Sequence, residues 1–319
     1  MNKQNTKVKK FIDFIITQKC TYSCIYCSQS KNKITNPKNA SRTTINSFYN
    51  FLKTLDNDYE ITITGGEAIL HPNFFEIIET IKNLGFTINL ITNLSFNIQL
   101  YEKIFLILND KLNRFDISFH LDEIKDFSST IKKAELFLQK KPKNTHTTFF
   151  IPLYMIDEEK NKSIEKIINL AKKYNNEYSF QKIRFLDTYK NKEEEKSTYS
   201  SKHSIINSYG KICHAGSKSA VIYEDGKAYR CYSSRFLIGN YIGNINNKDF
   251  KLNNRAKSCC KKYCTCPKPY AYNQITKKTN KKEAINQSIK NYLFLPLMLV
   301  KNRNIIIEKA KQFLSLTKS

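Results

Sequence analysis

The sequence Cys20-Thr-Tyr-Ser-Cys24-Ile-Tyr-Cys27 places three cysteines on one short stretch, directly after the apolar run 11–16. Thiolates this close together can hold one metal centre, and no fourth Cys or His lies nearby. Tetrahedral zinc and cubane iron–sulfur clusters normally take four protein ligands. The stretch therefore predicts a centre with one coordination position open. On spacing alone, a disulfide framework, a partial zinc site or three unrelated core thiols remain as alternatives.

A second motif, Gly65-Gly66-Glu67, follows a predicted strand at 59–64, where Ile61 and Ile63 alternate with threonines. Two consecutive glycines at a strand end allow a ligand to approach the backbone more closely than other residues do. Alone, this motif indicates only a turn. It is more specific here because the chain's first predicted strand is followed by C-x3-C-x2-C.

Together the two motifs resemble the radical S-adenosylmethionine (SAM) superfamily. The resemblance implies that Cys20, Cys24 and Cys27 ligate a [4Fe–4S] cluster, whose open iron is chelated by the amino acid end of SAM. It also implies that the backbone of Gly65, Gly66 and Glu67 receives the SAM amino group. The signature usually continues with proline, and here the next residue is Ala68.

Predicted strands and helices alternate along the first 186 residues. Because right-handed crossovers between successive strands give a parallel sheet, the pattern predicts an α/β fold. The resemblance implies a partial (β/α)6 radical SAM barrel, followed by a small Cys-rich extension of a β-hairpin plus helix and loops. The predicted strands are 11–16, 59–64, 86–91, 114–119, 145–151 and 182–186, and the predicted helices are 41–55, 73–84, 101–108, 123–139 and 164–174.

Polar residues stand at the predicted strand ends, where α/β barrels gather their chemistry. Besides the two motifs, they include Thr92, Asn93, Ser118, His120, Tyr154 and Asp187. The resemblance implies that Asn93 and Ser118 lie near the SAM ribose and carboxylate, and that Tyr26 lies against the adenine. We take His120 as a candidate catalytic residue, with a hydrogen-bonded structural histidine as the alternative.

Cysteines return after a predicted linker. Cys213 and Cys231 flank a predicted hairpin around Asp225-Gly226, in the pattern C-x12-G-x4-C. This pattern resembles SPASM and twitch extensions, which hold auxiliary iron–sulfur clusters. Six cysteines outside the barrel are too few for two fully ligated clusters. We expect one auxiliary [4Fe–4S] cluster on Cys213, Cys231, Cys260 and one of Cys264 or Cys266, with a structural zinc ribbon as the alternative.

Four regions are expected: a barrel at 1–190, a linker at 191–210, an auxiliary domain at 211–270 and a basic helical segment at 271–319. The segment packs against the barrel or, because basic residues flank its apolar ones, makes a peripheral membrane contact. No apolar run is long enough to span a bilayer, and no signal peptide is evident. The cytoplasm is the expected compartment, where the nine cysteines stay reduced.

The formal net charge is +25, and the chain from Lys211 onward holds 22 basic and 5 acidic residues, a net +17. Acidic partners such as nucleic acid are one interpretation, and a solvated lysine-rich surface is the other. A non-catalytic, metal-stabilised nucleic-acid-binding protein is therefore the alternative function. Under that reading, the six-strand pattern and the Gly65-Gly66-Glu67 motif have no explanation.

The resemblance implies an enzyme that cleaves SAM to methionine and a 5′-deoxyadenosyl radical, which takes a hydrogen atom from a substrate. An external electron donor of the flavodoxin or ferredoxin type is expected. Oxidation, epimerisation or crosslinking of a small molecule or peptide would follow. Only ten residues precede the first predicted strand, so we expect no N-terminal leader-binding domain.

Overall fold

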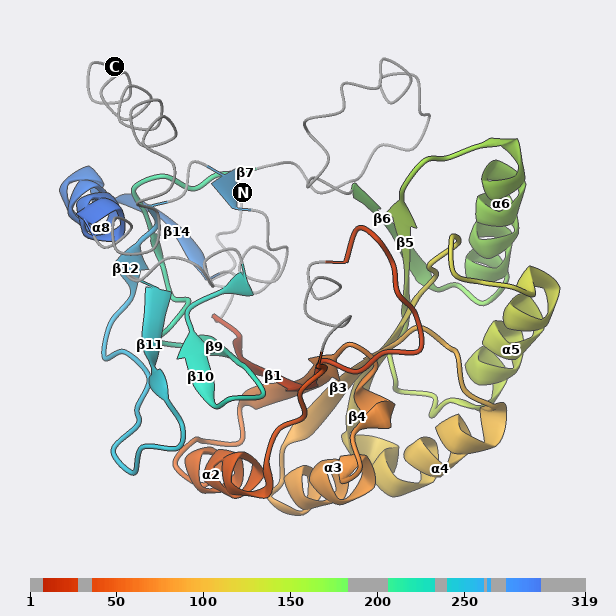
Figure 1. The fold of residues 1–319 in the computed structure, drawn as a ribbon, viewed down its shortest axis with the longest axis horizontal. Coiled ribbons are helices and arrows are strands. Elements are labelled where there is room, and N and C mark those ends of the chain that lie inside the picture. The colour runs from red at the N-terminus through yellow and green to blue at the C-terminus, as the bar shows by residue number, and fades with distance from the viewer. Residues whose placement is uncertain are drawn as a thin grey trace, which may run out of the picture.

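The computed structural model describes residues 8–27, 36–182, 206–232, 240–260, 263–264 and 274–293. Within them, a nine-stranded sheet has the order β11-β10-β9-β1-β2-β3-β4-β5-β6 (Figure 1). Neighbouring strands from β1 to β6 are parallel. These strands are β1 (Lys10–Thr17), β2 (Tyr59–Gly65), β3 (Thr87–Thr92), β4 (Leu112–Ser118), β5 (Thr148–Leu153) and β6 (Glu177–Lys182).

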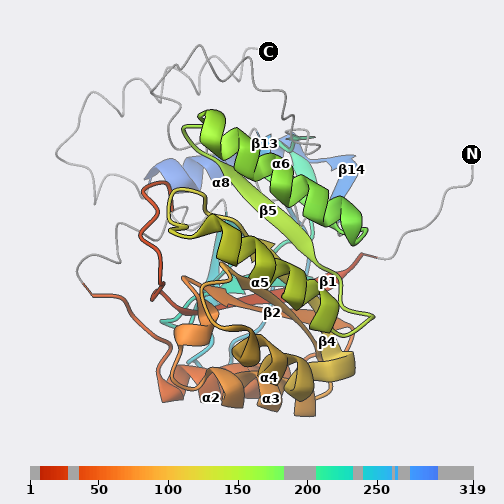
Figure 2. The same cartoon turned by 90° about the vertical axis from the view of Figure 1, so that its right-hand side faces the viewer.

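Helices follow β1 to β5 in turn and lie side by side along one face of the parallel sheet (Figure 2). Short 3-10 turns follow β2 and α4, at Ala68–Leu70 and Asn109–Lys111. No helix in the described part of the chain is long and apolar enough to cross a bilayer. The helices are α2 (Arg42–Leu52), α3 (Phe74–Asn83), α4 (Ile98–Leu108), α5 (Phe127–Lys140) and α6 (Glu158–Lys173).

Capping residues explain where four of these helices begin. The side-chain oxygen of each cap accepts a hydrogen bond from a backbone N–H of the first turn, which otherwise has no partner. Helix α6, for example, begins after Asp157, which accepts from the Lys160 N–H. The other caps are Ser41, Asn97 and Asp126.

The hydrophobic core lies between the helices and the sheet. Side chains alternate between the two faces of a strand, so Leu90 of β3 and Phe115 of β4 pack with the helices. On the opposite face of the sheet, β3 and β4 carry Asn89 and Asp116, which are buried as well. The sheet therefore has one apolar face and one face with buried polar groups.

The C-terminal part extends the same sheet. Strand β9 (Ser219–Ile222) runs parallel to β1, and β10 (Lys227–Tyr229) and β11 (Tyr241–Asn244) continue antiparallel. A three-stranded sheet stands beside it, in the order β12-β8-β14, with α8 (Lys281–Leu293) next to β12. Its strands are β12 (Lys257–Ser258), β8 (Lys211–Cys213) and β14 (Ile275–Thr279), and a separate pair joins β13 (Tyr263–Cys264) to β7 (Ile206–Asn207).

The predicted α/β class with a parallel sheet is confirmed, and so is the hairpin at Asp225-Gly226, between β9 and β10. The sixth strand, predicted at 182–186, begins earlier, because β6 is Glu177–Lys182 and includes the first residue of the predicted range. Its sequence EYSFQK alternates aromatic and polar residues, which is the pattern of a strand with two different faces. Residues 183–186 lie outside the described residues.

Candidate metal and cofactor site

The three cysteines follow the carboxyl end of β1, in residues 19–27, hereafter the cysteine loop. The chain that enters this loop pairs with residues 38–40, which precede α2. The Ala40 N–H donates to the Ile16 carbonyl at 2.8 Å, and the Gln18 N–H donates to the Lys38 carbonyl at 2.8 Å. An antiparallel bridge joins Thr17 to Asn39 between these bonds. Backbone pairing therefore holds the residues just before the cysteine loop against residues 38–40.

The three cysteines form no disulfide, and Cys24 is buried while Cys20 and Cys27 are half-buried. A turn brings the Cys27 N–H to the Cys24 carbonyl at 3.0 Å. In the described residues, no group of three or more His, Cys, Asp or Glu side chains is arranged to hold a metal ion. The ligands of a cubane attach to different iron atoms, so their sulfurs need not meet at one point. Three thiols on one short stretch therefore suit the ligand set of a cubane cluster.

The second motif is bonded directly to the start of the cysteine loop. The Gly66 N–H donates to the Thr17 carbonyl at 2.9 Å, and the Glu67 N–H donates to the Lys19 carbonyl at 2.7 Å. A Cβ atom on Gly66 would lie 2.2 Å from the Lys19 carbonyl oxygen. Glycine is therefore required at this position by backbone packing, whatever ligand binds there.

Glu67 is buried, and burial raises the pKa of its carboxyl from 4.5 to about 7. One carboxyl oxygen accepts hydrogen bonds from the Thr92 hydroxyl at 3.2 Å and the Asn93 N–H at 2.8 Å. These donors oppose the effect of burial without cancelling it. The motif at the end of β2 is thus joined to the end of β3.

Asn93 continues this connection to the cysteine loop. Its side-chain amide donates to the Thr21 hydroxyl at 2.9 Å and lies 3.6 Å from the Cys20 sulfur. Its amide oxygen accepts from the Ser95 N–H at 3.1 Å. Two predicted site residues, Cys20 and Asn93, therefore lie in contact.

His120 lies at the same rim. Its Nδ1 is 3.4 Å from the Cys24 sulfur and 3.0 Å from the Tyr26 hydroxyl. The Tyr26 ring stacks on the imidazole at 5.9 Å and also lies 5.2 Å from the Tyr154 ring. Burial, and then the Cys24 thiol, raises the pKa of Tyr26 above its usual range. One cluster of contacts is thus formed by Cys24, Tyr26, His120 and Tyr154.

Ser118 is the exception among the predicted cofactor residues. It is the last residue of β4 and is half-buried, but its hydroxyl has no hydrogen-bond partner among the described residues. Asp187, the sixth predicted rim residue, lies outside the described residues.

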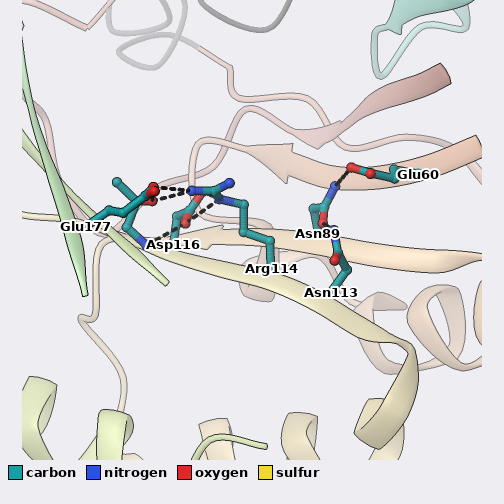
Figure 3. Close-up of polar contacts among 7 residues, drawn as sticks. Glu60, Asn89, Asn113, Arg114, Asp116 and Glu177 are labelled. Atoms are coloured by element: carbon teal, nitrogen blue, oxygen red, sulfur yellow. Dashed lines mark hydrogen bonds and ion pairs between the residues drawn. The ribbon is translucent and has the colours of Figure 1, made fainter. Parts of the chain in front are cut away.

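The polar face of the sheet carries two groups of contacts (Figure 3). In one, the Arg114 Nε donates to both carboxylate oxygens of Asp116 at 2.9 Å, and the Thr148 N–H donates to the same carboxylate at 2.8 Å. In the other, the Asn89 amide donates to Glu60 at 3.2 Å. Hydrophobic runs are usual in parallel strands covered on both faces, so this polarity is unusual.

Two of the C-terminal cysteines lie at neighbouring strands, because Cys213 ends β8 and Cys259 directly follows β12. Cys213 is buried, which raises the pKa of its thiol to about 12, and it interacts electrostatically with the Cys259 and Cys231 thiols. Cys213 pairs with Lys257, and the Cys259 N–H donates to the Lys211 carbonyl. This register puts Cys259 on the same face as Cys213.

Cys260, which the sequence favoured as a ligand, follows Cys259 and lies beyond β12. The signal that could have indicated Cys259 is the two-residue alternation, but it requires the pairing partner, which the sequence does not show. For Cys264 only the backbone is described, and Cys266 lies outside the described residues.

The Radical SAM superfamily model matches residues 14–122 of this chain. These residues contain both sequence motifs. The α/β fold with its parallel sheet matches that of radical SAM partial barrels. No curated protein matches the sequence.

Solved structures share this fold at low sequence identity. The structure of anSMEcpe with bound AdoMet and Cp18Cys peptide is 15% identical, covers 95% of this chain and 99% of its own, and has a TM-score of 0.50. Streptococcus suis SuiB bound to precursor peptide SuiA is 12% identical, with a TM-score of 0.51. The match covers 76% of this chain and 64% of SuiB.

Proposed function

We propose that this chain is a radical SAM enzyme that generates a 5′-deoxyadenosyl radical and uses it to remove a hydrogen atom from a substrate. The single observation that carries the proposal is the bonding of the Gly65-Gly66-Glu67 motif to the start of the cysteine loop. Two motifs that are separate in the sequence lie against each other, and the three cysteines of the loop form no disulfide.

In this proposal, Cys20, Cys24 and Cys27 hold a [4Fe–4S] cluster and leave one iron for SAM. When bound, the cluster supplies the electron that breaks a carbon–sulfur bond of SAM. The backbone and carboxylate of Glu67 receive the SAM ammonium group, whose positive charge favours the ionised carboxylate. Asn93 and Ser118 orient the rest of the cofactor, and Tyr26 contacts the adenine.

His120 is proposed to act beside the cluster, because its Nδ1 lies within reach of Cys24. It can hold the Cys24 thiolate and Tyr26 in place through one ring nitrogen. A role as proton donor or acceptor toward the substrate is the catalytic form of this proposal. An external electron donor is required in either form.

The substrate is proposed to be a small molecule or a peptide. Two structural neighbours, anSMEcpe and SuiB, are bound to peptides. Oxidation, epimerisation and crosslinking are the outcomes that hydrogen abstraction allows.

An auxiliary [4Fe–4S] cluster is proposed for the C-terminal cysteines. Cys213 and Cys231 remain its first two ligands, and the strand register favours Cys259 over Cys260 as the third. One of Cys260, Cys264 or Cys266 completes the set. A zinc site built from the same thiols is the competing proposal, and metal analysis separates the two.

The test is anaerobic reconstitution with iron and sulfide, followed by reduction with dithionite in the presence of SAM. We expect more than four irons per chain if both clusters form, and release of 5′-deoxyadenosine. Cys24→Ala is expected to abolish cleavage while circular dichroism stays unchanged. Ser23→Ala, in the same loop, is the matched control and should retain cleavage. A fully iron-loaded chain that cleaves no SAM contradicts the proposal.

A further inference from the structure

The cysteine loop is held by a residue from the other end of the chain. Glu224 follows β9 in the C-terminal hairpin and is 6% exposed. Its carboxylate accepts a hydrogen bond from the side-chain amide of Gln18, which is 206 positions away in the sequence and 7% exposed. The contact is close because β9 pairs directly with β1, the strand that leads into the cysteine loop.

Gln18 uses both ends of its amide. While its nitrogen donates to Glu224, its oxygen accepts from the Lys38 N–H at 3.3 Å. The Gln18 backbone N–H also donates to the Lys38 carbonyl at 2.8 Å. Gln18, which directly precedes the cysteine loop, therefore connects Lys38 to Glu224 of the C-terminal hairpin.

The chemistry of the acceptor determines how this amide is oriented. The Glu224 carboxyl oxygen accepts from the nitrogen end of Gln18, and the oxygen end then accepts from the Lys38 N–H. With the amide reversed, its NH2 group would face the Lys38 N–H and its oxygen would face the Glu224 oxygen, so both ends of the buried Gln18 amide would lose their partners.

We propose that Glu224 is a positioning residue. It fixes Gln18, and with it the start of the cysteine loop, in the position that lets the loop cysteines bind the cluster. The proposal rests on the proposed function only in assigning the cluster to this loop. It gives the C-terminal hairpin a role in the barrel site that is separate from any auxiliary cluster. Glu224 is not proposed to touch SAM or substrate.

The experiment compares four full-length chains: Glu224→Ala, Glu224→Gln, the exchange Gln18→Glu with Glu224→Gln, and the control Asp225→Ala. Asp225 neighbours Glu224 but is exposed and bonds to Lys227 within its own hairpin. Hydrogen–deuterium exchange is followed in peptides covering residues 19–27, in β9 and in β10. Loss of iron to a chelator is followed by the visible absorption of the reconstituted cluster.

For Glu224→Ala we expect exchange in residues 19–27 and iron loss to become about tenfold faster, as when a buried hydrogen bond is lost. Exchange in β9 and β10 should not change, and Asp225→Ala should show wild-type rates. For Glu224→Gln, the rates of exchange and iron loss should lie between those of the wild type and Glu224→Ala. The exchanged pair should restore wild-type rates, because the amide then comes from position 224 and the acceptor from position 18.

Wild-type exchange in residues 19–27 of Glu224→Ala overturns the proposal. An exchanged pair no better than Glu224→Gln alone also overturns it, because orientation of the amide is then irrelevant. If Glu224→Ala speeds exchange in residues 19–27 but the reconstituted wild type cleaves no SAM, the positioning role is supported and only the proposed activity is contradicted.

Discussion

Glu67 shows at the scale of one residue how the site depends on burial. It is the last residue of its motif and lies in the protein interior, where the charged form of a carboxyl is disfavoured. The hydrogen bonds from Thr92 and Asn93 recover only part of that cost. A cation that binds beside such a carboxyl lowers its pKa and so favours the ionised form.

The raised pKa makes stability depend on pH in a defined direction. Because the folded pKa of Glu67 is about 7 against an ordinary 4.5, the folded state favours the protonated carboxyl. Its contribution to stability is full below pH 4.5 and is lost as the pH rises through about 7. As the pH rises between these limits, we expect the free energy of unfolding of the wild type to fall by up to about 3 kcal/mol more than that of Glu67→Gln.

Urea unfolding at several pH values in this range measures the effect. Glu76→Gln is the control, because the pKa of the exposed Glu76 is lowered by Arg42 and this carboxylate does not titrate in that range. Parallel curves for the wild type and Glu67→Gln would contradict the prediction.

At the scale of elements, the cysteine loop and the turn after β2 are packed backbone against backbone. Gly66→Ala would put a Cβ atom 2.2 Å from the Lys19 carbonyl oxygen and 2.7 Å from its carbon. Backbone cannot move aside as a flexible side chain can, so the start of the cysteine loop must shift. We expect Gly66→Ala to lower cluster content and SAM binding at least about tenfold, which corresponds to about 1.4 kcal/mol.

Gly85→Ala is the matched control for this prediction. Gly85 has a φ of +92°, and its added Cβ would meet the tip of the Asn57 side chain, away from the cysteine loop. It should lower the melting temperature without changing SAM affinity in titration calorimetry. Equal SAM affinity in Gly66→Ala and the wild type would show that the shift does not occur.

At the scale of the whole molecule, the C-terminal hairpin and the barrel share one sheet. Ala220 in β9 is fully buried and pairs with Ile12 in β1, inside the main hydrophobic core. The hairpin therefore completes the β1 side of the barrel, and the two parts should unfold together.

Ala220→Asp tests this cooperativity by placing a charge in that core. We expect the free energy of unfolding to fall by roughly 3 kcal/mol or more. Hydrogen exchange should become faster in β1 and β2 as well as in β9. Lys227→Gln, on the exposed side of the same hairpin, should change little. Loss of protection confined to β9 and β10 would indicate two independent units.

Much of the fold could be predicted from the sequence because helices and buried strands have local signals. The alternation of Ile61 and Ile63 with threonines indicated β2, and Asp225-Gly226 indicated the hairpin. Residues 164–174 were expected to sit in a helix, and the exact start of α6 depends on capping by Asp157 rather than on the apolar pattern. The early start of β6 gave little signal, because EYSFQK is only weakly apolar.

The sequence by itself determined that three thiols stand on one loop and that a Gly-Gly-Glu turn ends the next strand, because short spacings survive any arrangement of the chain. Only the tertiary structure decided that β9 lies beside β1, that Glu224 meets Gln18, and that Cys259 shares a face with Cys213. Those contacts join residues far apart in the sequence. Strand pairing and register create them, and neither leaves a local signal in the chain.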